Sequence, residues 1–259
     1  MEPDYPVPHS SWNNEGSSTI VLIHGACTSR VWWDITIPHL PPSYHILAPD
    51  LPGHGEASQE EYSVQSAADS VAQLITDKAI NSKAHIIGHS LGADVAIHFA
   101  NAYPDLINSI FVSGFGSIPQ GSLTSVVPYA VWTMQRIENL IPKPAIRWAM
   151  DGTDLPATSP SSLDLCRRVM APRAGWPEPW PARTLIVVAG KGGLIPSADN
   201  PKVALRLVET GRRRNSETVA YVHPKMRHPW NRQDPRLFAD AAVAWIESKA
   251  LPDGFEKLA

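Results

Sequence analysis

A serine with the surroundings of a nucleophile lies in the first half of the chain. Ser90 occupies the segment Gly88-His89-Ser90-Leu91-Gly92, after the strand-like run 84–87 and before the apolar, helix-compatible run 93–100. A G-x-S-x-G pattern between a strand and a helix sets a serine hydroxyl above the sheet on a sharp turn. The backbone of such a turn is strained and crowded, which glycine tolerates. These residues predict Ser90 as a catalytic nucleophile.

A serine hydroxyl needs a base to take its proton, and His228 is the best candidate for that base. It lies in the late segment 227–238, which reads RHPWNRQDPRLF. Imidazole suits this role because its proton affinity lies near neutral pH. His223, five residues earlier, is the alternative base. We expect three other histidines to shape the surrounding loops through hydrogen bonds and not to act in catalysis: His24, His54 and His89.

Six apolar runs of the buried-strand type alternate with helix-compatible segments. This pattern predicts an α/β fold, with a mostly parallel six-stranded sheet and helices on both faces. The predicted strands are 19–23, 44–48, 84–87, 109–112, 184–189 and 218–222. Ligands of such sheets bind beyond the carboxyl ends of the strands. Ser90 and the loop that carries His228 both follow strand ends, so we expect them to converge on one edge of the sheet.

Residues 117–181 interrupt the alternation of strands and helices. This segment is rich in proline and helix-compatible over 126–140 and 146–150. We therefore predict a core formed by 1–116 and 182–259, with a helical cap inserted at 117–181. The insertion carries four tryptophans, which suggest a hydrophobic substrate pocket: Trp132, Trp148, Trp176 and Trp180.

Composition narrows the classes of function. The formal net charge of −3 argues against nucleic acid as the main partner. No apolar run is long enough to span a membrane, and the N-terminal residues do not have the pattern of a signal peptide, so we expect a cytoplasmic protein without a membrane partner.

Cys27 and Cys166 are too few for a disulfide framework or a zinc cluster, and Cys27 is interpreted as a buried small hydrophobe. No metal or cofactor is expected, and a homodimer stays open.

Four motifs occur in one order along residues 19–250. They are His24-Gly25 after the first predicted strand, DLPGHG (50–55) after the second, GHSLG around Ser90, and His228 followed by Pro235 and Phe238. In this order they resemble the α/β-hydrolase superfamily, and the insertion 117–181 resembles that family's cap. VLIHGAC (21–27), together with GHSLG and the lack of an N-terminal β-hairpin, also looks like the plant methyl-esterase and hydroxynitrile-lyase branch.

The resemblance and the strand–turn–helix geometry together indicate an oxyanion hole. Such a site needs two backbone N–H donors that are aimed at one point. The two donors are expected from Leu91, directly after the nucleophile, and from Ala26, directly after His24-Gly25.

The carboxylate of a catalytic triad is missing from its usual place. The family pattern implies an acid after the strand 184–189, where this chain has Gly193, and the loop 113–116 holds no acid either. Asp199 is the nearest carboxylate, but a position beside a predicted helix N-terminus already favours a negative charge there. Three alternatives stay open. A carboxylate from elsewhere orients His228, water or a backbone carbonyl does so, or the site performs a reaction other than hydrolysis.

These observations lead to three hypotheses of different classes. The first is a serine hydrolase of small apolar or aromatic carboxylic esters, lactones or thioesters, with an acyl-enzyme on Ser90 and His228 as base. The second is a lyase, isomerase or cyclase of small-molecule metabolism, with His228 as a proton shuttle, and the glycine at 193 motivates it. The third is a non-catalytic receptor for small molecules, against which the presence of both Ser90 and His228 argues.

Overall fold

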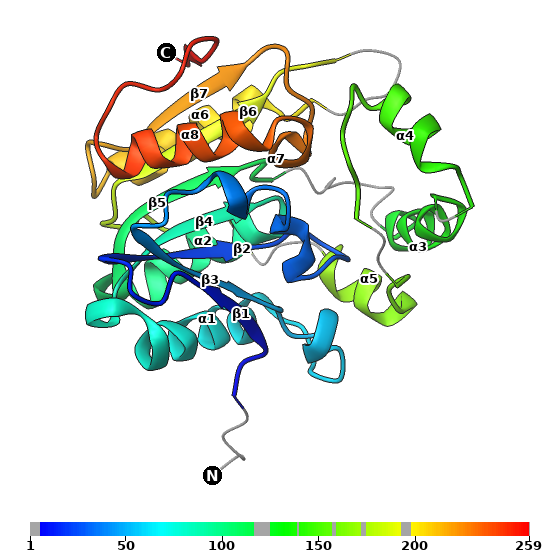
Figure 1. Cartoon of the computed structure of the whole chain (residues 1–259), viewed down its shortest axis with the longest axis horizontal. Coiled ribbons are helices and arrows are strands. Elements are labelled where there is room, and N and C mark those ends of the chain that lie inside the picture. Colours follow the sequence, from blue (N-terminus) through cyan, green and yellow to red (C-terminus); the bar gives the residue numbers. More distant parts are fainter. Residues whose placement is uncertain are drawn as a thin grey trace.

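An eight-stranded sheet forms the centre of the molecule, in the order β1-β3-β2-β4-β5-β6-β7-β8 (Figure 1). The computed structural model describes residues 6–116, 125–138, 140–156, 159–171, 175–192 and 198–258. The six predicted strands are all present and pair in parallel with one another. They are β2 (Ser18–Ile23), β3 (Tyr44–Pro49), β4 (Ala84–His89), β5 (Ile107–Ser113), β6 (Thr184–Ala189) and β7 (Val219–His223). The predicted fold class is thereby confirmed.

Two further strands close the edges of the sheet, so the predicted number of six was too low. β1 (His9–Trp12) pairs antiparallel with β3, and β8 (Glu256–Lys257) pairs antiparallel with β7. Neither is fully buried: β1 is half-buried for most of its length, and β8 is exposed. Edge strands of this kind lack the continuous apolar run that identifies a buried strand in a sequence.

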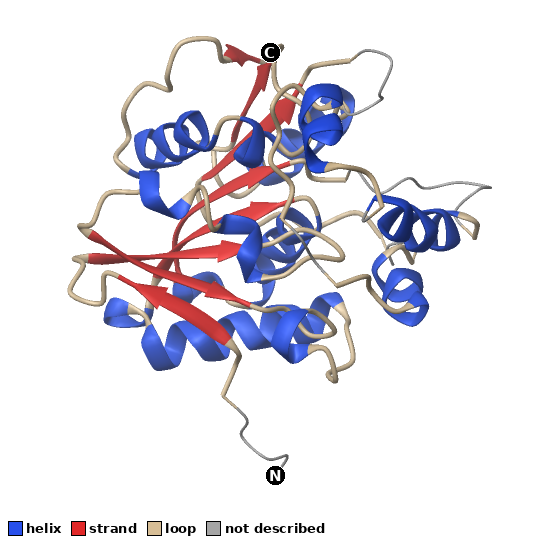
Figure 2. Cartoon of the chain, turned by 45° about the vertical axis from the view of Figure 1, so that its right-hand side comes forward, coloured by secondary structure: helices blue, strands red, loops and turns tan. Residues whose placement is uncertain are grey.

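Each face of the sheet is covered by helices because neighbouring strand residues point to opposite sides. On β2, Val21 and Ile23 belong to one apolar cluster, whereas Ile20 and Leu22 belong to another. The first cluster includes α1 (Val64–Lys78), α2 (Leu91–Ala102) and α6 (Pro201–Arg212). The second includes α8 (Pro235–Ile246), α7 (Trp230–Gln233) and the 3₁₀ helices Arg30–Trp33 and Ile37–His39. Figure 2 shows the two helical layers on either side of the strands.

Three more helices lie together at one side of the sheet, beyond the carboxyl ends of the parallel strands (Figures 1 and 2). They are α3 (Val127–Glu138), α4 (Lys143–Ala149) and α5 (Leu163–Val169), all within the predicted insertion. The first two match predicted helices, and α5 was not predicted. Residues 117–124, where the predicted cap begins, lie outside the described residues, so the boundaries of the cap stay a prediction. No helix in the described part of the chain is long and apolar enough to cross a membrane.

Candidate active site

Ser90 lies on the turn between β4 and α2, as the sequence predicts. Its backbone has φ 56° and ψ −116°, a conformation that is strained for a residue with a side chain. The Ser90 N–H donates to the carbonyl of Ser113 at 2.8 Å, which ties the turn to the end of β5. Although Ser90 is the N-cap of α2, its hydroxyl does not cap the helix. The hydroxyl is therefore free to point away from the helix and take part in chemistry.

The close packing of the turn explains its glycine at position 92. A Cβ at Gly92 would lie 2.2 Å from the carbonyl oxygen of Ile23 and 2.7 Å from that of His24. The first turn of α2 thus rests directly on the backbone at the end of β2. This contact brings the segment after β2, which holds Gly25 and Ala26, alongside the turn of Ser90.

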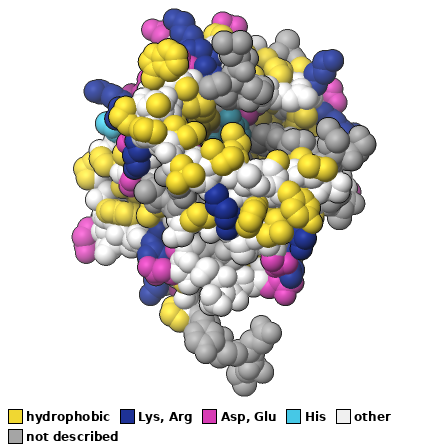
Figure 3. All heavy atoms as spheres, turned by 90° about the vertical axis from the view of Figure 1, so that its right-hand side faces the viewer, with side chains coloured by type: hydrophobic (Ala, Val, Ile, Leu, Met, Phe, Trp, Pro, Cys, Tyr) yellow, Lys and Arg dark blue, Asp and Glu magenta, His cyan; other side chains and the backbone are white. Residues whose placement is uncertain are grey.

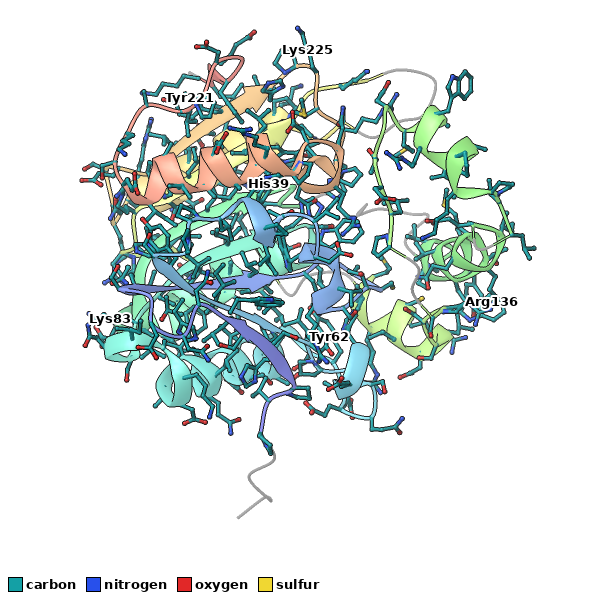
Figure 4. All side chains as sticks on the ribbon, in the orientation of Figure 1. His39, Tyr62, Lys83, Arg136, Tyr221 and Lys225 are labelled. Atoms are coloured by element: carbon teal, nitrogen blue, oxygen red, sulfur yellow. The ribbon has the colours of Figure 1, made fainter. Side chains whose placement is uncertain are left out.

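His228 lies in the loop after β7, and its ring reaches the turn of Ser90. The ring packs against that of His89, with 4.8 Å between the centroids. Its Cε1 atom lies 2.5 Å from the point where a Cβ on Gly114 would be. Gly114 directly follows Ser113, whose carbonyl accepts the N–H of Ser90. Figure 4 marks Lys225 on the turn that connects β7 to this loop. The structure therefore brings His228 to the residue directly before Ser90, although more than half the chain separates Ser90 and His228 in the sequence.

The carboxylate that contacts His228 is that of Asp199. Its Oδ1 accepts a hydrogen bond from His228 Nδ1 at 2.6 Å, and its Oδ2 accepts one from the N–H of Ala189 at 2.8 Å. The Asp199 N–H in turn donates to the carbonyl of Ala189 at 2.8 Å, so both the side chain and the backbone are fixed to the end of β6. The side chain of Asp199 is 3 % exposed, and that of His228 is 25 % exposed.

Asn200, and not Asp199, is the residue whose side chain caps the neighbouring helix α6. Asn200 is the N-cap of α6, and its side chain accepts the N–H of Lys202 at 3.0 Å. Since Asn200 caps the helix, the carboxylate before it is free to turn toward His228. Gly193, at the usual place of the acid, lies outside the described residues. A carboxylate directly before a complete Asn-Pro cap was the available signal in the sequence.

The two predicted oxyanion donors lie on either side of Ser90. Leu91 begins α2, and N–H groups in the first turn of a helix have no acceptor within the helix. Ala26 follows Gly25, whose Cβ position would lie 3.4 Å from the Cβ of Ser90. The next N–H, of Cys27, donates to His54 Nε2 at 3.1 Å, which fixes the segment in place. Both donors thus border the nucleophile, and their role in an oxyanion hole stays a prediction.

Neutral histidines hold the loops around the site. The Nε2 of His24 accepts the N–H of Leu51 at 3.1 Å, while its Nδ1 donates to the carbonyl of Gly25 at 2.8 Å. Complete burial, with the nearby His54 adding to it, lowers the pKa of His24 to about 3. His54 accepts the Cys27 N–H and donates to the carbonyl of Pro52 at 2.9 Å, and burial lowers its pKa as well. Each ring connects the segment after β2 with the segment after β3.

His89 and His223 have other surroundings. His89 is 1 % exposed, stacks on Trp32 at 5.8 Å between centroids, and has a pKa well below its ordinary value because of burial. His223, the alternative base, packs its ring on Phe255 at 5.0 Å, near the C-terminal end of the chain. Asp199 is bonded to His228 and not to His223, so the geometry favours His228 as the base.

The cap helices contribute apolar side chains to the core cluster on one face of the sheet. Val127 and Val131 of α3 and Leu165 of α5 join the apolar cluster that contains Leu91 and Ala26. Apolar side chains also gather on the outer face of the cap (Figure 3). A hydrophobic substrate pocket under the cap stays a prediction.

Each cap tryptophan has a contact of its own. Trp148 is 87 % exposed, and Trp132 lies under the guanidinium of Arg136 at 3.8 Å (Figure 4). Trp176 donates to Thr210, on α6, at 2.7 Å, and Trp180 is fully buried and donates to Thr184 at 2.7 Å. A tryptophan of the core, Trp32, contacts the site through the ring of His89.

Among the described residues, no group of three or more histidine, cysteine, aspartate or glutamate side chains could hold a metal ion.

The chain resembles known proteins over most of its length. A family model described as "Alpha/beta hydrolase family" matches residues 20–241. An "AB hydrolase superfamily protein" of Gibberella zeae is 33 % identical over 246 residues, which cover 94 % of this chain and 85 % of that protein. A pimeloyl-[acyl-carrier protein] methyl ester esterase of Neisseria meningitidis is 38 % identical over 92 residues, which are 35 % of this chain and 34 % of the esterase.

Solved structures have the same fold at low sequence identity. An esterase from Thermogutta terrifontis superposes with a TM-score of 0.68 at 18 % identity and covers 93 % of both chains. An esterase from Exiguobacterium antarcticum superposes with a TM-score of 0.69 at 16 % identity and covers 92 % of this chain and 94 % of its own. The family model and the Gibberella zeae relative show the family: this chain belongs to the alpha/beta hydrolase family.

Proposed function

We propose that this protein hydrolyses small apolar or aromatic carboxylic esters, lactones or thioesters through an acyl-enzyme on Ser90. The observation that carries the proposal is the 2.6 Å hydrogen bond between His228 Nδ1 and Asp199 Oδ1. Because the carboxylate accepts the Nδ1 proton, Nε2 is left with a lone pair for the proton of Ser90. A histidine held in this tautomer beside a serine on a strained turn is suited to acyl transfer.

In the first half of the reaction, Ser90 Oγ attacks the ester carbonyl while His228 Nε2 takes the hydroxyl proton. The carbonyl oxygen gains negative charge, which the N–H groups of Ala26 and Leu91 are placed to stabilise. Asp199 stabilises the imidazolium that forms. The C–O bond to the alcohol then breaks, His228 returns its proton to the departing alcohol, and the acyl group stays on Ser90.

In the second half, water replaces the alcohol. His228 takes a proton from the water as the water attacks the acyl-enzyme, and the same two N–H groups stabilise the oxyanion. The acid departs when His228 returns the proton to Ser90 Oγ. One ester and one water give one acid and one alcohol, and the enzyme returns to its starting state.

The class of substrate rests on the surroundings of the site. Apolar side chains of α3 and α5 belong to the same apolar cluster as Leu91, and Trp32 stacks on His89, whose ring also contacts that of His228. An apolar acyl or alcohol group would bury against them, at about 25 cal/mol per Å² of apolar surface. The printed names of several relatives, among them a methyl ester esterase, support esters as the class of substrate.

The lyase, isomerase or cyclase hypothesis loses its main support. It rested on the absence of a carboxylate that could orient His228, and Asp199 now occupies that place. A histidine that is oriented for Ser90 favours covalent catalysis over a proton shuttle without acylation.

A fluorophosphonate probe tests the proposal directly, because it phosphonylates only activated serines. We expect a single adduct on Ser90, found by peptide mass spectrometry, and hydrolysis of p-nitrophenyl esters of short acyl chains that the same probe abolishes. Ser90→Ala should lose both, whereas Ser58→Ala, at an exposed serine, should keep both. A folded protein without an adduct on Ser90 would refute the proposal. A p-nitrophenyl benzoate series then tests the preference for aromatic acyl groups.

A further inference from the structure

The two cysteines of the chain meet at the boundary between the oxyanion segment and the cap. Cys27 directly follows Ala26, and Cys166 lies on α5. Their Sγ atoms are 3.8 Å apart, although 139 positions separate the residues in the sequence. Two sulfurs at this distance are in contact. The interpretation of Cys27 as an isolated buried hydrophobe was therefore wrong, since it is half-buried and paired with a second thiol.

Both cysteines are held by packed surroundings. Cys27 has φ 57°, a left-handed conformation, and its N–H is bound to His54. On the other side, the Cδ1 atom of Leu165, next to Cys166, lies 2.7 Å from the point where a Cβ on Gly53 would be. The residue before His54 thus contacts the residue before Cys166. Tyr62, whose ring lies 5.8 Å from that of His54, is in the same region (Figure 4). The meeting of the sulfurs is therefore a feature of the packed fold.

The two thiols differ in reactivity. Cys27 is half-buried, whereas Cys166 is fully buried. A hydrogen bond from the Cys166 thiol, helped by Ser161 and Gln135 and opposed by burial, lowers the pKa of Cys27 to about 7. The pKa of Cys166 is raised, since its proton is shared with Cys27 and its surroundings are apolar. A thiolate is the nucleophilic form of cysteine, so Cys27 is suited to react first and Cys166 second.

We propose that Cys27 and Cys166 form a reversible disulfide when a peroxide oxidises the protein, and that this bond lowers the reactivity of Ser90. The Cys27 thiolate attacks one peroxide oxygen and breaks the O–O bond, which gives a sulfenic acid and, after protonation of the leaving hydroxide, water. The Cys166 sulfur then attacks the Cys27 sulfur, and the S–O bond breaks. The leaving hydroxide takes the Cys166 proton as a second water. Two thiols are oxidised, and one peroxide is reduced to two waters.

The bond requires the sulfurs to approach from 3.8 Å to about 2.05 Å. Part of that movement falls on Cys27, and therefore on the neighbouring N–H of Ala26. A displacement of about 1 Å at a catalytic group costs on the order of 100-fold in rate. This effect on Ser90 rests on the proposed function, whereas the formation of the disulfide does not. A dithiol reductant reverses the bond by exchange.

The first measurement follows the bond itself and needs no enzymatic activity. The reduced full-length protein is treated with increasing hydrogen peroxide and analysed by intact mass without reductant. We expect a mass lower by about 2 Da, for the two hydrogens lost, and a cross-linked peptide pair containing Cys27 and Cys166. Dithiothreitol should restore both free thiols. The proposal is overturned if both thiols stay free, or if Cys27 proceeds to the sulfinic acid while Cys166 remains a thiol.

The second measurement is the rate at which a fluorophosphonate labels Ser90. We expect oxidation to lower this rate by about 10- to 100-fold, and dithiothreitol to restore it. Cys166→Ala should label at the basal rate but lose the reversible decrease, and Cys166→Ser serves as a second variant if the first does not fold. A disulfide that leaves the labelling rate unchanged would overturn the regulatory part. If reduced protein does not label at all, the proposed function fails, and the mass measurement still decides whether the pair forms.

Discussion

Replacing Asp199 by asparagine tests the arrangement of the site at a single atom. In the wild type, Oδ2 accepts the N–H of Ala189 and Oδ1 accepts the Nδ1 proton of His228. Asparagine has one acceptor oxygen and one donor amide. The backbone N–H of Ala189 can only donate, so the oxygen of the new side chain must face it. The amide then faces His228 Nδ1, which is forced to accept, and the ring proton moves to Nε2.

The size of the effect follows from this change of tautomer. With a proton on Nε2, His228 has no lone pair for the hydroxyl of Ser90, so the base is lost while the fold is kept. The corresponding change in a serine protease lowers kcat by about 10⁴. At about 1.36 kcal/mol for each factor of ten, that is roughly 5 kcal/mol of transition-state stabilisation. Since the carboxylate is only 3 % exposed, bulk water is poorly placed to replace it. We expect a loss of about 10³- to 10⁴-fold in kcat.

The assay is the hydrolysis of a p-nitrophenyl ester at saturating substrate, together with the rate of fluorophosphonate labelling. Asp164→Asn is the matched control, since Asp164 lies on α5, is 68 % exposed, and pairs only with surface groups such as Arg168. Exposed pairs contribute about 0–1 kcal/mol, so this variant should stay within a few-fold of the wild type. If Asp199→Asn keeps more than about a tenth of kcat while His228→Gln removes the activity, another group orients the histidine and the reasoning is wrong.

Three further variants or conditions test other parts of the structure. Gly114→Ala would place a Cβ 2.5 Å from Cε1 of His228 at φ 71°, so we expect at least a tenfold loss of kcat with about 1 kcal/mol of destabilisation, measured by steady-state kinetics and urea unfolding. The pKa of His24 is about 3 in the folded protein and 6.5 in the unfolded chain, so between these pH values the unfolded chain binds more protons. The free energy of unfolding therefore falls as the pH decreases from 6.5 toward 3. Urea titrations at pH 6.5 and 5 should show a loss of up to about 2 kcal/mol from this residue, which His24→Gln removes; an unchanged pH dependence in the variant would contradict the assignment. The rate of alkylation of Cys27 by iodoacetamide should rise with pH and reach half of its plateau near pH 7, and Cys166→Ala should shift this midpoint upward because the donor is lost; a midpoint near 8.5 in the wild type would contradict the thiol pairing.

The core of the fold was predictable because it depends on patterns that repeat. Each buried strand is a run of apolar residues, and β6 has the predicted bounds, 184–189. Helix α8 begins at Pro235 with Asp234 as its N-cap, and an Asp-Pro pair is typical of a helix start. The short strands β1 and β8 and the cap helix α5 were not predicted. These elements are stabilised by the surfaces on which they pack, because their own residues show little hydrophobic periodicity.

The sequence identified the candidate site residues that follow strand ends. It left the role of Asp199 unassigned, because the position of this residue depends on the fold of a loop. Ser90 and Leu91 are fixed by the strand–turn–helix pattern, within which every position is defined. Asp199 is ten residues beyond Ala189, and nothing local measures how the chain between them folds back. Only its tertiary pairing with Ala189, through both side chain and backbone, sets its position against His228.

The hydrogen bonds of the rings also explain why one histidine among several is suited to act as the base. His24 and His54 each accept a backbone N–H on Nε2 and donate from Nδ1, so a second proton on either ring would lose an existing bond. His89 is buried against Trp32, where a charge would be costly. His228 differs because its Nδ1 proton is held by a carboxylate and its side chain is partly exposed. Because Asp199 accepts the Nδ1 proton, Nε2 is the ring nitrogen of His228 that keeps a lone pair, which suits this ring, of the four, to the proposed role of base.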